Sequence, residues 1–145
     1  MAFSQRPLLI ADDDQNVVAY LRTLLSREHF LVDTALDGED ALRKIKRNWY
    51  SLILLDLLLP KMNGFEILRE LKALHPRILN RIIVITGAST ATLSSFDERQ
   101  VFALLRKPFT RGELLPLVRQ CAGIDPTEVE PRPATTKVER IPLHH

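Results

Sequence analysis

The chain has 145 residues, of which 46% are hydrophobic, and its 20 basic and 18 acidic side chains leave a net charge of +2. This length suits one domain with a tail, and so small a charge gives little reason to expect direct nucleic-acid binding. The longest apolar stretch, residues 52–60, contains Asp56 and is far too short to cross a bilayer. No signal peptide precedes the first strand, and the single cysteine, Cys121, suits a reducing cytosol. We therefore expect a cytoplasmic protein without a membrane span.

Apolar runs alternate with segments of helical period along the first half of the chain. The first predicted strand, residues 8–11, precedes Asp14, which can cap a helix. A short strand over residues 31–35 precedes Asp37-Gly38, which opens a second helix. The third strand, residues 51–56, is apolar from residue 52 to residue 55, as expected for a central strand covered on both faces.

The second half continues the alternation, with one irregular helix. Asn63-Gly64 forms a loop before the third helix, and the fourth strand covers residues 81–86. Residues 87–100 are rich in Ser and Thr, so we expect a short or irregular fourth helix there. The fifth strand covers about residues 101–105.

The last predicted helix begins with a capping motif and contains a proline. Thr110 and Glu113 form a capping box at its beginning. Pro116 lies past the first turn, which predicts a kink, with a late helix start as the alternative. We expect the domain to cover residues 1–122 and the proline-bearing residues 123–145 to form a disordered or loosely docked tail.

Strict alternation with short connections predicts an α/β fold, a doubly wound five-stranded parallel sheet with five flanking helices. A reversal of winding puts the switch point between the first and third strands, and ligands bind such sheets at the carboxyl ends of the strands. Polar residues follow four of the five strands at that edge: Asp12-Asp13, Asp56, Thr86 and Lys107.

These residue types suit phosphoryl chemistry. Clustered carboxylates repel one another unless a cation neutralises them, and Mg²⁺ accepts one or two carboxylates while keeping several waters. We expect Asp13 and Asp56 to be direct Mg²⁺ ligands, Asp12 to hold a water, and Leu58 to add its backbone carbonyl. Lys107 and the Thr86 hydroxyl would contact phosphoryl oxygens, which leaves Asp56 as the nucleophile. Each residue alone also has a purely structural interpretation, as a cap, a turn residue or a surface lysine.

The chain resembles the receiver domains of two-component response regulators over roughly residues 7–121. The resemblance rests on LLIADDD, LILLDLLLPKMNG, IVITGA and RKPF, which contain the acidic pair, Asp56, Thr86 and Lys107 in order. It implies a flavodoxin-like fold with strand order 2-1-3-4-5. It also implies Mg²⁺-dependent transfer of a phosphoryl group to Asp56 from a histidine kinase or a histidine phosphotransfer protein, and control of an output protein. Such a domain is a signalling module that catalyses only its own phosphorylation and dephosphorylation.

The sequence departs from this family at several positions. Leu104 occupies the position where the family usually carries Tyr or Phe; Phe102, on the same strand face, could substitute for that ring, although we expect it to pack in the core. The unusual fourth helix affects the face made by helix 4, strand 5 and helix 5, through which family members often dimerise. Leu58 and Ala88 match positions that tune hydrolysis, and neither side chain can orient a water, so we expect a long-lived phosphoryl group.

Two other functions compete with this interpretation. Leu104 and the odd fourth helix favour an interaction module that keeps the fold and works without phosphorylation, whereas the complete acidic site opposes it. A phosphatase of the haloacid dehalogenase type needs a second acid two residues after its nucleophile, and that residue here is Leu58. The sequence has too few residues after Cys121 for a DNA-binding domain, so we expect no direct operator binding, and residues 123–145 could begin a linker.

Overall fold

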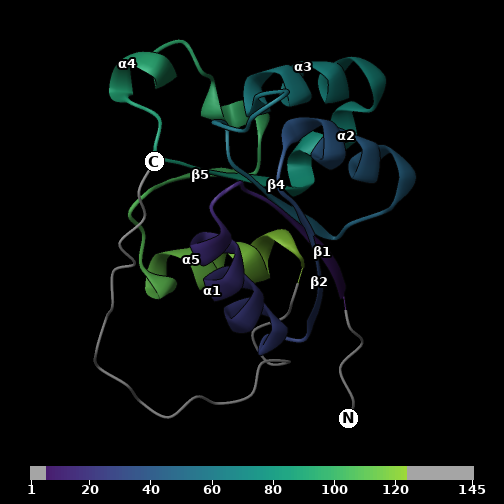
Figure 1. The fold of residues 1–145 in the computed structure, drawn as a ribbon, viewed down its shortest axis with the longest axis vertical. Coiled ribbons are helices and arrows are strands. Elements are labelled where there is room, and N and C mark those ends of the chain that lie inside the picture. Colours follow the sequence, from purple (N-terminus) through teal and green to yellow (C-terminus); the bar gives the residue numbers. More distant parts are fainter. Residues whose placement is uncertain (1–5, 124–145) are drawn as a thin grey trace.

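A computed structural model describes residues 6–123, and the tail predicted for residues 123–145 lies almost entirely outside this range. Five parallel strands form one sheet in the order β2-β1-β3-β4-β5, as predicted (Figure 1). Their bounds are β1 Arg6–Ala11, β2 Phe30–Ala35, β3 Leu52–Leu55, β4 Ile82–Thr86 and β5 Ala103–Arg106.

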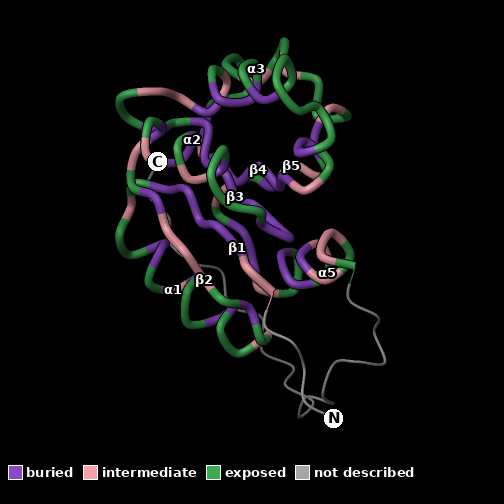
Figure 2. Tube along the Cα trace, turned by 90° about the vertical axis from the view of Figure 1, so that its right-hand side faces the viewer, coloured by how far each residue is buried: buried purple, intermediate pink, exposed green. Residues whose placement is uncertain are grey.

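Helices connect successive strands and cover both faces of the sheet. Their bounds are α1 Gln15–Ser26, α2 Gly38–Arg47, α3 Gly64–Leu74, α4 Thr90–Leu93 and α5 Arg111–Cys121, with 3-10 turns at Pro76–Arg81 and Glu98–Gln100. Figures 1 and 2 show α1 and α5 on one face and α2 and α3 on the other. The sheet is therefore the middle of three layers.

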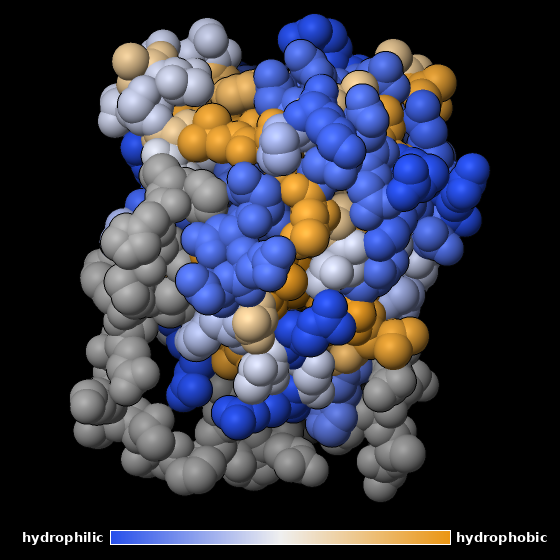
Figure 3. All heavy atoms as spheres, viewed as in Figure 1, coloured by the Kyte–Doolittle hydropathy of each residue, from blue (hydrophilic) through white to orange (hydrophobic). Residues whose placement is uncertain are grey.

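Each face of the sheet has its own hydrophobic core. Leu8, Ile10 and Leu54 point into the core shared with α1 and α5. Leu9 and Ile53 point into the core shared with α2 and α3, because alternate residues of a strand face opposite sides. Figure 2 shows β1, β3 and β4 as buried, while the outer sides of the helices are exposed. On the side of the molecule seen in Figure 3, hydrophilic side chains cover most of the described surface and hydrophobic ones form small separate patches.

Polar caps begin the helices where the sequence predicts them. The Asp14 carboxylate accepts hydrogen bonds from the amides of Asn16 and Val17, and Asp37 and Asn63 cap α2 and α3 in the same way. The capping box of Thr110 and Glu113 is complete, so α5 begins at Arg111. The alternative of a late start at Pro116 is wrong, and the kink at that proline stays a prediction.

The segment between β4 and β5 agrees with the sequence in part. The fourth helix is short, as predicted, because α4 has only four residues. The strand after it begins at Ala103, two residues later than expected, and the prediction that Phe102 packs in the core is wrong, since Phe102 is 36% exposed. Phe102 directly precedes β5, which is an edge strand of the sheet. Within residues 6–123, the structure has no helix long and apolar enough to cross a membrane.

Candidate functional site

The polar residues that end four strands meet at the carboxyl edge of the sheet. Asp12 follows β1, Asp56 follows β3, and the Asp56 amide donates to the Ala11 carbonyl at 2.9 Å, which aligns these two strand ends. Thr86 ends β4, and its carbonyl accepts from the Lys107 amide at 2.9 Å, which aligns the ends of β4 and β5. Parallel pairing thus brings together residues that lie far apart in the sequence.

The Lys107 ammonium bridges two buried carboxylates. Its Nζ lies 2.8 Å from Asp12 Oδ2 and 3.0 Å from Asp56 Oδ2. The side chains of Lys107, Asp12 and Asp56 are 1%, 4% and 0% exposed. Charges so deeply buried need an opposite charge within hydrogen-bond distance, and this arrangement supplies one to both acids.

The surroundings of Asp12 raise the pKa of its carboxyl. Burial raises the pKa of its carboxyl, and the nearby Asp56 raises it further. The hydrogen bond and positive charge of Lys107 oppose this effect, as does the Asp14 amide, which donates to Asp12 Oδ1 at 2.9 Å. The pKa of Asp12 nevertheless lies above its ordinary value of 3.8, so a further cation beside it would relieve the crowding of negative charge.

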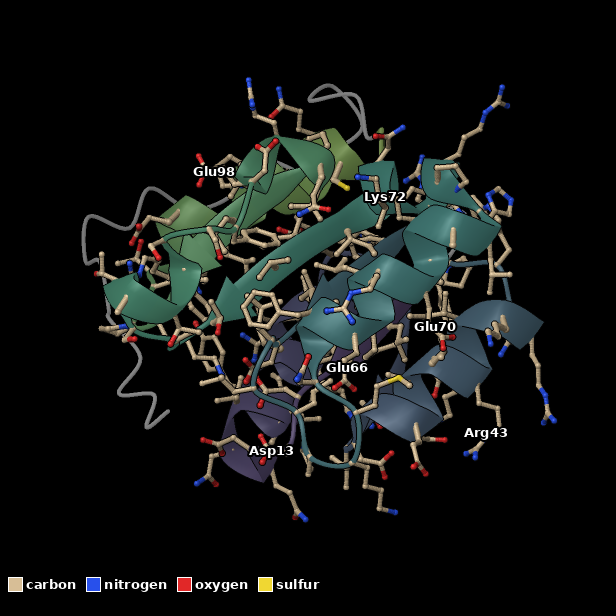
Figure 4. The ribbon with its side chains drawn as sticks, turned by 90° about the horizontal axis from the view of Figure 1, so that it is seen from above. Asp13, Arg43, Glu66, Glu70, Lys72 and Glu98 are labelled. Atoms are coloured by element: carbon tan, nitrogen blue, oxygen red, sulfur yellow. The ribbon has the colours of Figure 1, made fainter. Side chains whose placement is uncertain are left out.

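A third acid completes a set of oxygen donors. Asp12, Asp13 and Asp56 each offer a carboxylate oxygen, and these oxygens lie within 4.8 Å of one another. Asp13 is the exposed member, and Figure 4 shows it beside the start of α1. Hard, anionic oxygens around a solvent-accessible opening are the donors that Mg²⁺ prefers, because this ion retains several of its waters. The residues present therefore fit a magnesium ion.

Two loop contacts support the site. The Leu58 amide donates to Asp56 Oδ1 at 3.0 Å, so the second oxygen of the Asp56 carboxylate has a partner of its own. The Thr86 hydroxyl is buried and accepts from the Ala88 amide at 3.1 Å. The sequence suggested a role for the Leu58 carbonyl but could not predict the contact made by its amide, because every residue except proline carries the same backbone N–H.

The strand after α4 also touches the loop that follows Thr86. The Arg106 guanidinium donates to the Ala88 carbonyl at 2.9 Å and to the Thr90 hydroxyl at 3.4 Å. Leu104, where relatives usually have an aromatic ring, is partly buried against the core of α2 and α3. Sequence reasoning missed Arg106, since a single arginine on an edge strand has many possible partners.

Comparisons with known proteins agree with this geometry. Residues 8–119 match the family model of the response regulator receiver domain. The response regulator ArlR of Staphylococcus aureus is 37% identical over 114 residues, which are 77% of this chain and 50% of that protein. The chain thus spans about half the length of the curated relatives it matches.

Solved structures show the same fold. A CheY-like receiver domain protein from Methanospirillum hungatei superposes with a TM-score of 0.74 at 28% identity, covering 87% of this chain and 100% of that one. The response regulator TrrA from Thermotoga maritima, solved in complex with Mg(2+)-BeF, has a TM-score of 0.71 at 28% identity, covering 81% and 99%. With this fold, the acidic cluster and the matched family, the chain belongs to the response regulator receiver domains.

Proposed function

We propose that this domain accepts a phosphoryl group on Asp56 from a phosphohistidine donor, with Mg²⁺, and thereby switches a partner-binding surface. The observation that carries the proposal is the buried contact between the Lys107 ammonium and Asp56, beside two further acids. In the transfer, a carboxylate oxygen of Asp56 bonds to phosphorus while the bond from phosphorus to the donor imidazole nitrogen breaks.

The surrounding residues have distinct roles in this proposal. Asp12, Asp13 and Asp56, with the Leu58 carbonyl, would hold the magnesium ion, which neutralises negative charge on phosphoryl oxygens when bound. Lys107, which follows β5, would supply a second positive charge, and the Thr86 hydroxyl would donate to a phosphoryl oxygen. The Leu58 amide keeps the acceptor carboxylate oriented from its other oxygen.

Receiver domains work between histidine kinases and output domains. We infer that a histidine kinase or histidine phosphotransfer protein is the donor here and that an output protein, not nucleic acid, contacts this domain directly. The face made by α4, β5 and α5 is our candidate surface for that partner or for a homodimer. We place the protein in the cytoplasm, where such kinases present their phosphohistidine.

Phosphoryl uptake from acetyl phosphate tests the proposal. Intact-mass measurement of the protein with Mg²⁺ should show one added phosphoryl group, and chelation of the metal should abolish it. Asp56→Asn should take up none, whereas Asp97→Asn, which alters an exposed acid in the cap of a 3-10 turn, should behave as the parent. Equal uptake by Asp56→Asn and its parent would contradict the assignment.

The lifetime of the phosphoryl group is a second measurable property. Leu58 is 40% exposed and Ala88 is buried, and neither side chain has a polar atom to orient an attacking water. We expect decay over many minutes after the donor is removed, and faster decay in Leu58→Asn, whose amide can hold a water. A half-life of seconds in the parent would show that another group positions the water.

Leu104 favours the competing proposal of a module that works without phosphorylation, because the usual aromatic ring is missing. Beryllofluoride with Mg²⁺ separates the two. Under the leading proposal it should shift amide resonances near Thr86 and in β5, and a change confined to Asp56 and its immediate neighbours would favour the competing one.

A further inference from the structure

A surface groove lies at the opposite end of the sheet from Asp56. It encloses about 450 Å³ between the carboxyl-terminal ends of α2 and α3 and the residue that precedes β4. Trp49, Leu74 and Ile78 form its apolar lining, and the first two are 62% and 64% exposed. Large apolar side chains held this open to solvent are typical of a binding surface.

The charged side chains that line the groove are all basic. Lys46 and Arg47 come from the end of α2, Arg81 comes from the turn before β4, and no described lining residue is acidic. The Arg81 guanidinium lies 5.4 Å from the Trp49 ring centroid and donates to the Tyr50 carbonyl at 2.9 Å, so the indole and this charge are held together.

One acid approaches from outside the groove. Glu70, which lies between α3 and α2 in Figure 4, accepts from Lys46 at 3.5 Å, and both side chains are nearly half exposed. Such an exposed pair is weak, so Lys46 remains available to another carboxylate. The groove therefore suits a peptide that carries apolar side chains among acidic ones.

The end of α5 contacts the turn that precedes β4, which also carries the groove residue Arg81. The Cys121 thiol, in the last turn of α5, is 3.8 Å from the Asn80 carbonyl, and Asn80 directly precedes the groove residue Arg81. Gly123, with a positive φ of 70°, follows two residues later. The described chain thus ends close to the turn that carries the groove residue Arg81.

We propose that residues 124–130 of this chain bind the groove. They read Ile-Asp-Pro-Thr-Glu-Val-Glu, with three acids, no base and two branched apolar side chains. Each extended residue spans about 3.3–3.6 Å, so the seven residues that follow Gly123 reach at most about 23–25 Å from it. A tether this short gives an effective concentration on the order of 1 mM, which favours this segment over an unattached acidic peptide.

Trp49 offers a direct readout because it is the only tryptophan of the chain. We expect Glu128→Lys in the full chain to raise the acrylamide quenching constant of Trp49 fluorescence by about two-fold, since release of the segment exposes the indole. Glu139→Lys makes the same substitution in the same tail beyond the segment and should leave quenching unchanged. High salt should raise quenching in the parent and not in Glu128→Lys.

Variants of the groove test the other partner. Arg47→Glu should raise quenching as Glu128→Lys does, and the two together should restore protection by exchanging the charges. Arg43, on the same helix, pairs with Asp40 and does not line the groove, so Arg43→Glu is the matched control. Equal quenching in Glu128→Lys, Glu139→Lys and the parent would overturn the proposal. Protection that disappears on dilution would also overturn it, because the occupant would then be the tail of a second copy.

Discussion

Two ion pairs at opposite ends of the sheet differ sharply in burial: Lys107 with Asp56 at the carboxyl ends of the strands, and Lys46 with Glu70 at the other end. Lys107 and Asp56, 3.0 Å apart, have side chains 1% and 0% exposed. Lys46 and Glu70, 3.5 Å apart, are 47% and 46% exposed. A buried pair cannot lose one member without leaving a charge in a poor solvent, whereas an exposed pair exchanges partners with water at little cost. One end of the sheet is therefore suited to chemistry and the other to reversible recognition.

Replacing one lysine at each end of the sheet should give the largest difference in the free energy of unfolding. We expect Lys107→Met to lower the free energy of unfolding by about 3–5 kcal/mol in the absence of Mg²⁺, because two buried carboxylates would face each other. Lys46→Met is the matched control and should cost less than about 1 kcal/mol. Urea denaturation measures both. Similar values for the two variants would show that the burial of Lys107 does not control its contribution.

Backbone packing at the carboxyl end can be tested with a pair of glycines. A Cβ on Gly38 would lie 1.6 Å from the Met62 carbonyl oxygen, in the loop between β3 and α3, whereas a Cβ on Gly112 would meet only the Thr110 hydroxyl at 3.9 Å. Gly38→Ala should therefore destabilise the fold by about 1–3 kcal/mol. Gly112→Ala should be neutral or stabilise by up to about 1 kcal/mol, since alanine favours the helix. Thermal unfolding of both proteins distinguishes the signs.

The half-exposed carboxylate of Asp33 in β2 is intermediate between the buried pair of Lys107 and Asp56 and the exposed pair of Lys46 and Glu70. Burial alone would raise the pKa of its carboxyl, but hydrogen bonds from Tyr50 and the Thr34 amide, with the charge of Lys44, lower it below the ordinary 3.8. The unfolded chain then binds the proton more tightly, so this carboxylate stabilises the fold at neutral pH. That stabilisation is lost as the pH falls from about 3.8 through the lowered pKa.

Measuring unfolding against pH tests the role of Asp33. After solvent screening we expect Asp33→Asn to cost less than about 1 kcal/mol at neutral pH and nothing in strong acid. Tyr50→Phe removes the hydroxyl that donates to Asp33 at 2.6 Å and should reduce the same pH dependence. A constant difference between Asp33→Asn and its parent at every pH would show that the pKa of Asp33 is not lowered by folding.

The sequence predicted the features that depend on the type of residue at a particular position, such as strand ends and helix caps. Strand ends were visible because a buried apolar run stops at a polar residue, as at Leu55-Asp56, and caps were visible because Asp14, Asp37 and Thr110 have oxygens at the right positions. The sequence also placed Lys107 at the same edge as Asp12 and Asp56, but it did not predict their direct ion pairs, because it assigned the ammonium to phosphoryl oxygens.

Two further features depend on neighbours that the sequence does not identify. Phe102 was expected in the core because the sequence placed it inside the fifth strand, yet β5 begins one residue later and lies at the edge of the sheet. Gly38 gave no sign of its contact with the loop at Met62, because close backbone approach requires the whole fold to be assembled.

The hydrogen bond from Arg106 to the Ala88 carbonyl has a mechanical consequence. Ala88 lies two residues after Thr86, and Arg106 is the last residue of β5, so one guanidinium joins the loop that follows β4 to an edge strand of the sheet. Any displacement of that loop must either pull β5 along or break this link. In a domain with an aliphatic residue at position 104, such a tether can relay movement to the edge of the sheet without a rotating ring.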